Sequence, residues 1–260
     1  MTGNDPQAAA GSQAENSHIP GRTVAAGRGW DWIVEGFALF RKQPGMWILT
    51  VVLLGVISIV IGTVPLLGPL ANALLFPIFA GGLMLGCEAL NRNGTLELSH
   101  LFAGFKQKTG DLVLVGAFNL VGWVVITIAV FAVVGGGVFM GIMRGGMPGV
   151  GISIASMLIA LLLVTGLSLP LYMATWFAPA LIVLHGLAPA AALKASFYAC
   201  LRNWIPFLIY SVVLLVACLI AVIPAFLGFL VLIPVLIASV YTAYRDIFCA
   251  GEQTELAAIR

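Results

Sequence analysis

Long apolar stretches without a charged residue are the dominant pattern along the chain. Between Lys42 and Glu88 lie 45 uncharged residues, whereas a helix that crosses a bilayer needs about 20 apolar residues. This stretch therefore predicts two spanning helices with a turn at residues 65–69. The other stretches predict four more, so the expected spans are 46–67, 69–90, 112–134, 153–184, 205–223 and 226–244.

The composition agrees with this pattern and excludes the soluble classes of protein. Hydrophobic residues make up 61% of the 260 positions and charged residues 8%, against about 25% charged residues in an ordinary soluble domain. So few charges cannot cover a globule of this size with a solvated surface, which excludes a soluble enzyme, a disordered chain and a nucleic-acid binder. The prediction is an all-α, polytopic membrane protein with six transmembrane helices.

The segments outside the spans predict tails, a loop and an orientation. Residues 1–28 and 249–260 are expected to be tails around a membrane domain at 29–248, and the glycine-rich stretch 135–151 predicts a flexible loop. Eleven of the twelve basic residues lie on one side of the expected spans, and Arg144 lies on the other. Because basic residues concentrate on the cytoplasmic side, both termini are expected in the cytoplasm.

Three amphipathic segments precede pairs of expected spans. The first, residues 30–42, carries apolar residues at the spacing of one helix face, namely Trp30, Ile33, Val34 and Phe37. Residues 98–108 and 189–204 show a similar pattern, and alignment of the three segments pairs Phe37 with Phe102 and Phe197. The chain is therefore expected to hold three units, at about 29–90, 95–184 and 187–245, each an interfacial helix followed by a hairpin of two spanning helices.

The second helix of each expected hairpin carries an internal proline with similar apolar neighbours; these are Pro77, Pro170 and Pro234. A proline removes a backbone donor and frees the carbonyl four residues earlier, so these are candidate kink positions at membrane depth. Asn119 is the most interior strongly polar residue of the spans. Either an interhelical hydrogen bond or a contact with a substrate accounts for it.

The motifs of the first unit resemble a known family. Residues 29–49, GWDWIVEGFALFRKQPGMWIL, are followed by VPLLGP at 64–69 and PIFAGGL at 77–83. These motifs resemble an uncharacterised family of proteobacterial six-span inner-membrane proteins, and residues 192–204 are distantly similar to the membrane domain attached to some glycerophosphodiester phosphodiesterases. The resemblance covers residues 29–248 and implies the six-span fold and a location in the bacterial cytoplasmic membrane. It implies no catalytic residues, because this sequence contains no soluble phosphodiesterase domain.

Residues that carry chemistry are scarce inside the spans. No Asp, Glu, Lys or Arg lies near the middle of any expected span. Glu88 is expected to pair with Arg92 at the interface, with an ion-coupling carboxylate as the alternative. The three histidines stand far apart and show no metal-binding spacing. We therefore expect no catalytic residue, no metal and no cofactor, and a protein that is not an enzyme.

Two hypotheses of function follow. In the first, the basic amphipathic segments organise membrane lipids or dock a membrane protein, which includes a second copy of this chain; the candidate lipid-headgroup contacts are Arg41, Lys42, Lys106, Lys108, Lys194 and Arg202. In the second, the protein is a transporter, channel or flippase for an apolar or lipid-like solute. The path of that solute would be lined by Asn119 and by the segments around Pro77, Pro170 and Pro234.

Overall fold

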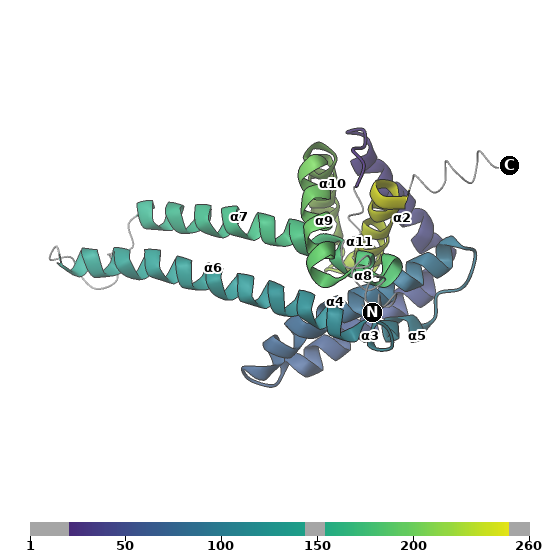
Figure 1. Ribbon diagram of the computed structural model, residues 1–260, viewed down its shortest axis with the longest axis horizontal. Coiled ribbons are helices and arrows are strands. Elements are labelled where there is room, and N and C mark those ends of the chain that lie inside the picture. The colour runs from purple at the N-terminus through teal and green to yellow at the C-terminus, as the bar shows by residue number, and fades with distance from the viewer. Residues whose placement is uncertain (1–20, 144–153, 250–260) are drawn as a thin grey trace, which may run out of the picture.

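The computed structural model describes residues 21–143 and 154–249, and these residues form helices without a strand (Figure 1). The elements, in chain order, are α2 (Arg28–Lys42), α3 (Pro44–Gly62), α4 (Leu67–Asn91), α5 (Leu98–Leu101), the 3-10 turn η1 (Ala103–Phe105), α6 (Thr109–Met143), α7 (Ile154–Trp176), α8 (Ala178–His185), α9 (Pro189–Arg202), α10 (Trp204–Val222), α11 (Phe229–Tyr244) and the π-helical turn η2 (Arg245–Cys249).

The prediction of six transmembrane helices is confirmed within the described residues. Six helical segments are long and apolar enough to cross a bilayer: Pro44–Gly62, Leu67–Asn91, Thr109–Gly137, Ser156–His185, Trp204–Val222 and Phe229–Cys249. The predictions for residues 1–20, for Arg144 and the loop at 144–153, and for residues 250–260 lie outside the described residues.

Three predicted boundaries are wrong. The third span continues to Met143, so Gly135–Gly137 belong to α6 and not to a loop; surrounding apolar residues favour a helix there, because a backbone in lipid must bond internally. The fourth span is interrupted at Phe177, since Pro179 in the first turn of α8 has no N–H to continue α7. The second amphipathic segment is divided into α5 and η1 and is not one helix.

The segment that precedes each spanning pair packs on a helix from another pair. Helix α2 lies on α11, where a Cβ on Gly36 would fall 2.7 Å from the backbone nitrogen of Ser239. The η1 turn lies on α4, where a Cβ on Gly104 would fall 2.1 Å from the carbonyl oxygen of Ile78. Helix α9 lies on α7, where the Ser196 hydroxyl donates to the Met173 carbonyl at 2.7 Å. Small residues therefore allow these elements to approach closely.

The helices α6 and α7 lie side by side and project away from the other elements (Figure 1). The core is formed elsewhere, where α2, α4, α8 and α11 meet. Its largest fully buried side chains include Trp32, Phe177, Leu181, Tyr241 and Tyr244. Most of the remaining helix surface is apolar and exposed, which suits a protein surrounded by lipid.

Candidate functional site

A buried carboxylate holds the beginning of the described chain against its end. The Asp246 side chain is 5% exposed and accepts hydrogen bonds from Arg28 Nε at 2.5 Å, from Trp32 Nε1 at 2.9 Å and from Arg22. Burial alone would lower the pKa of the Arg28 guanidinium, but its hydrogen bonds to Asp246 and Glu35 and the negative charges of these two residues together outweigh burial and raise that pKa. We call Arg22, Arg28, Trp32 and Asp246 the Asp246 network.

Asn203 reinforces this attachment through the backbone. Its Oδ1 accepts from the Val24 amide at 2.8 Å, and its Nδ2 donates to the Arg22 carbonyl at 3.0 Å. Neither Asn203 nor Asp246 was predicted from the sequence. The available signal was an acidic residue directly after the last span and an amide directly before the fifth, but neither position indicated its partner more than 170 residues away.

The predicted pair of Glu88 and Arg92 is confirmed. Arg92 Nε lies 2.5 Å from Glu88 Oε1, and the Tyr241 hydroxyl donates to the other oxygen of the same carboxylate. Arg245 donates to Asn91 Oδ1 at 2.6 Å beside them. These contacts join the last turn of α4 to α11 and satisfy the charge of Glu88.

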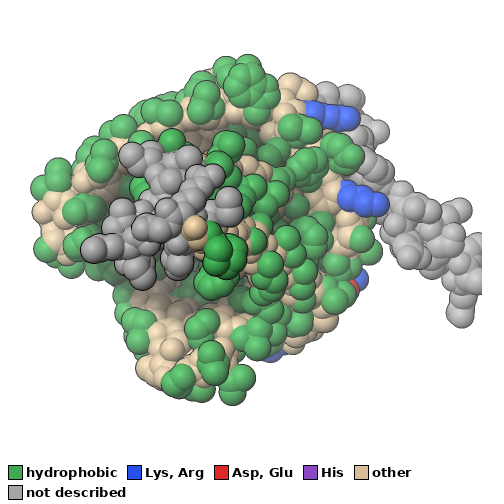
Figure 2. Space-filling model, turned by 90° about the vertical axis from the view of Figure 1, so that its left-hand side faces the viewer, with side chains coloured by type: hydrophobic (Ala, Val, Ile, Leu, Met, Phe, Trp, Pro, Cys, Tyr) green, Lys and Arg blue, Asp and Glu red, His purple; other side chains and the backbone are tan. Residues whose placement is uncertain are grey.

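The six candidate headgroup cations divide into two groups. Lys42 donates to the Leu90 carbonyl at 2.8 Å, and Lys108 lies 3.6 Å from Asp111. The other four are exposed and form no ion pair with a described residue; they are Arg41, Lys106, Lys194 and Arg202. We call these four the free cations. Figure 2 shows a face on which most of the visible side chains are hydrophobic, with the visible Lys and Arg side chains near its edge.

Exposed aromatic and aliphatic side chains accompany the free cations on the same elements. Helix α2 exposes Trp30, Val34 and Phe37, so most of the predicted apolar face of the first amphipathic segment is uncovered, whereas its fourth residue, Ile33, packs against the core. Phe102 and Phe105 are exposed before Lys106, and Tyr198 and Leu201 are exposed around α9. Such a combination of apolar faces and cations is typical of helices that lie in the headgroup layer.

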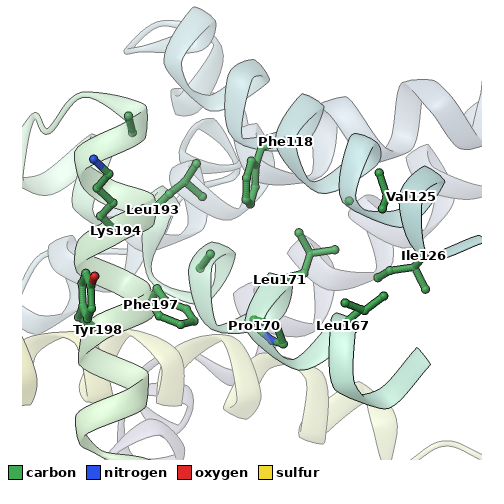
Figure 3. Close-up of a pocket in the computed structure, with 13 residues that line it drawn as sticks. Phe118, Val125, Ile126, Leu167, Pro170, Leu171, Leu193, Lys194, Phe197 and Tyr198 are labelled. Carbon is green, nitrogen blue, oxygen red and sulfur yellow. The ribbon is translucent and has the colours of Figure 1, made fainter. Parts of the chain in front are cut away.

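A pocket of about 650 Å³ lies between α6, α7 and α9. Its wall is apolar except for two side chains of α9, Lys194 and Tyr198. Figure 3 shows these two at one end of the pocket, with Val125, Ile126 and Leu167 at the other. The other lining residues are Phe118, Gly122, Pro170, Leu171, Ala174, Ala190, Leu193 and Phe197.

The structure does not bring the predicted intramembrane residues together. Pro170 lines the pocket, whereas Pro77 and Pro234 are buried at the contacts of α4 with η1 and of α11 with α2. Asn119 is half-buried on α6 and forms no hydrogen bond with a described residue, so its role stays a prediction. Interhelical hydrogen bonds of the described spans include two others: the Tyr210 and Ser239 hydroxyls lie 2.7 Å apart, and Asn72 donates to the Ser58 carbonyl at 3.0 Å.

No metal cluster is found in residues 21–143 and 154–249, where no three His, Cys, Asp or Glu side chains are grouped suitably. The expectation that the protein has no catalytic residue and no cofactor stays a prediction. The carboxylates of Asp246 and Glu88 both have protein partners, because Asp246 accepts from Arg28 and Glu88 accepts from Tyr241.

Comparison with known proteins finds one informative similarity. A protein of Burkholderia thailandensis named as a probable inner membrane protein is 30% identical over 196 residues, which cover 72% of this chain and 72% of that protein. No protein-family model matches the chain. No solved structure matches it significantly. The resemblance to the membrane domain of some glycerophosphodiester phosphodiesterases therefore stays a prediction.

Proposed function

We propose that the chain, which belongs to the same family as the probable inner membrane protein of Burkholderia thailandensis, binds and organises anionic lipid at the inner membrane without catalysing a reaction. The observation that carries this proposal is the set of four free cations, which are exposed beside uncovered apolar side chains. Docking of a membrane protein, or of a second copy, on the same elements is the alternative use of these surfaces.

Electrostatic attraction sets the expected free energy of lipid binding. A Lys or Arg near an anionic leaflet contributes about 1 kcal/mol, so the four free cations together contribute at most about 4 kcal/mol. Lys42 and Lys108 contribute less, because each already has a protein partner. The lipid surface should therefore depend on Arg41, Lys106, Lys194 and Arg202 more than on the remaining two candidates.

The free cations lie on, or directly after, three interfacial elements, and each of these elements is followed by a spanning hairpin. The elements are α2, the α5–η1 segment and α9, and each packs on a helix of another hairpin. Six crossings of the membrane would place all three elements on one side together with both termini. The excess of Lys and Arg on that side supports the cytoplasm as its location. Reporter fusions at the two termini test this orientation, and reporters active in opposite compartments would refute it.

Two matched fourfold variants test the lipid surface. In the first, the free cations are replaced with Gln; in the second, the same replacement is made at four partnered cations, Lys42, Arg92, Lys108 and Arg245. Both variants lose the same charge. Native mass spectrometry of protein taken from vesicles with phosphatidylglycerol should show fewer retained anionic lipids for the first variant. Equal retention in the two variants would contradict the proposal.

The pocket supports a second candidate, which is movement of a lipid-like solute. It is apolar, it lies beside Pro170, and it is large enough for part of an acyl chain. The absence of a carboxylate among its lining residues speaks for passive movement and against proton or sodium coupling. Fluorescent-lipid scrambling in vesicles that contain the protein tests this candidate, and a rate equal to that of protein-free vesicles would exclude it.

A further inference from the structure

We propose that the pocket between α6, α7 and α9 holds one acyl chain of an anionic phospholipid from the surrounding bilayer, with the lipid phosphate against Lys194. We call this site the α9 groove. The inference deepens the proposed function, on which it rests for the presence of anionic lipid, by assigning one lipid to one place. It depends on three features: the apolar wall, the free cation at one end, and the open junction between α9 and α6.

The apolar wall requires an apolar occupant. Residues Phe118–Ile126 of α6 and Leu167–Ala174 of α7 lie within membrane spans, so the medium around the groove is hydrocarbon. A void of about 650 Å³ without partner atoms would forfeit the dispersion contacts of its lining. Water does not replace them, since it needs two to four polar partners. An acyl chain can fill the space, and no hydrogen bond is lost when it does so.

The dimensions agree with a chain that lies along the hairpin. From Phe118 to Ile126, helix α6 rises about 12 Å at 1.5 Å per residue, and these two residues both line the groove. In Figure 3, Lys194 and Tyr198 lie at the end near α9 and the aliphatic residues Val125 and Ile126 at the far end. One end of the groove is therefore suited to a headgroup and the other to hydrocarbon.

The charge at the groove determines which lipid is preferred. Lys194 is the only charged residue of the lining, it is exposed, and it forms no ion pair with a described residue. An acyl chain gains little hydrophobic free energy on entering the groove, because it leaves an equally apolar medium. The wall therefore positions the chain, whereas Lys194 favours a lipid with net negative charge over a zwitterionic lipid.

The corresponding junction in the third hairpin is closed by the protein itself. Residues 29–43 and 189–203 have matching environments. Gly36 and Ser196 each contact a spanning helix just after its internal proline. Gln43 and Asn203 each accept a backbone N–H from the residues that lead into an interfacial segment. At the beginning of α2, a Cβ on Gly29 would lie 2.1 Å from the Pro206 carbonyl of α10. The matching place on α9 begins with Pro189 and Ala190, and Ala190 lines the open groove.

Substitutions on neighbouring positions of α6 provide a matched test. Val125 lines the groove and Val124 does not, and both side chains are about half exposed. The full chain is reconstituted in phosphatidylethanolamine vesicles that contain one quarter phosphatidylglycerol, and the last lipid that survives collisional stripping is identified by native mass spectrometry. V125W should lose this phosphatidylglycerol, because the indole occupies the space of the chain, whereas V124W should keep it.

A second pair of variants tests the charge without a change in the wall. K194Q should lower the preference for phosphatidylglycerol over phosphatidylethanolamine about fivefold, the equivalent of one cation near an anionic lipid. K106Q removes an exposed lysine that does not line the groove, so it should leave the preference of the last lipid unchanged. Equal behaviour of V125W and V124W, or of K194Q and K106Q, would overturn the proposal.

A third variant distinguishes an error in the α9 groove assignment from an error in the proposed lipid surface. A triple variant with Gln at Arg41, Lys106 and Arg202 removes the free cations outside the groove. If that variant loses anionic lipid while V125W keeps it, the groove assignment is wrong and the surface remains. If the triple variant keeps all its lipid while V125W and K194Q lose the last one, the surface is wrong and the groove remains.

Discussion

Replacement of Asp246 with Asn should weaken the attachment of α2 to η2, the turn that follows α11. Asp246 accepts three side-chain hydrogen bonds, two of them from guanidinium groups, and its side chain is 5% exposed. The amide keeps the shape of the carboxylate but has one acceptor oxygen and no charge. Because the Arg22 side chain is 54% exposed, water compensates much of its loss. The contact with Arg28 dominates the effect, and a hydrogen bond to a charged group contributes about 2 to 3 kcal/mol.

Hydrogen exchange of the backbone amides in α2 measures this release directly. A loss of about 2 to 3 kcal/mol in local stability corresponds to exchange that is about 30- to 150-fold faster. Asp111 provides the control, since its ion pair with Lys108 spans 3.6 Å between side chains that are partly exposed. D111N should change the rate of amide hydrogen exchange in α2 by less than about threefold. If D246N left the protection of α2 within the range of D111N, the Asp246 network would not be what holds this helix.

Three further substitutions test other contacts of the fold. G36A should lower the thermal stability of the detergent-solubilised protein by about 1 to 3 kcal/mol, because its Cβ meets the α11 backbone, whereas G55A, with open space around the position, should not. S196A should destabilise the break at Phe177, whose amide donates to Ser196 Oγ at 3.0 Å, and faster hydrogen exchange at Phe177 is the readout. Y210F should lower the melting temperature through loss of the buried hydroxyl contact with Ser239, worth about 0.6 to 1.7 kcal/mol, whereas Y172F at an exposed position should leave it unchanged.

The number and the approximate positions of the spans could be predicted from the sequence, because hydropathy is a local property that accumulates over about 20 consecutive residues. The boundaries were less predictable. Gly135–Gly137 have the composition of a loop but continue α6, and the break at Phe177 depends on Pro179 and on Ser196 of another helix. The pairing of Glu88 with Arg92 was predictable because it lies within one helix turn.

The sequence by itself determined a six-span helical membrane protein whose candidate headgroup cations lie outside the spans. The tertiary structure alone decided which of those cations have partners, which junction between hairpins is closed, and where the chain is attached to itself. Arg28 and Asp246 are 218 residues apart, and Lys194 shares a groove with Phe118 and Pro170 only because α9 packs on α7. Such contacts depend on the distance between helices in space, and no local pattern of apolar and polar residues contains that distance.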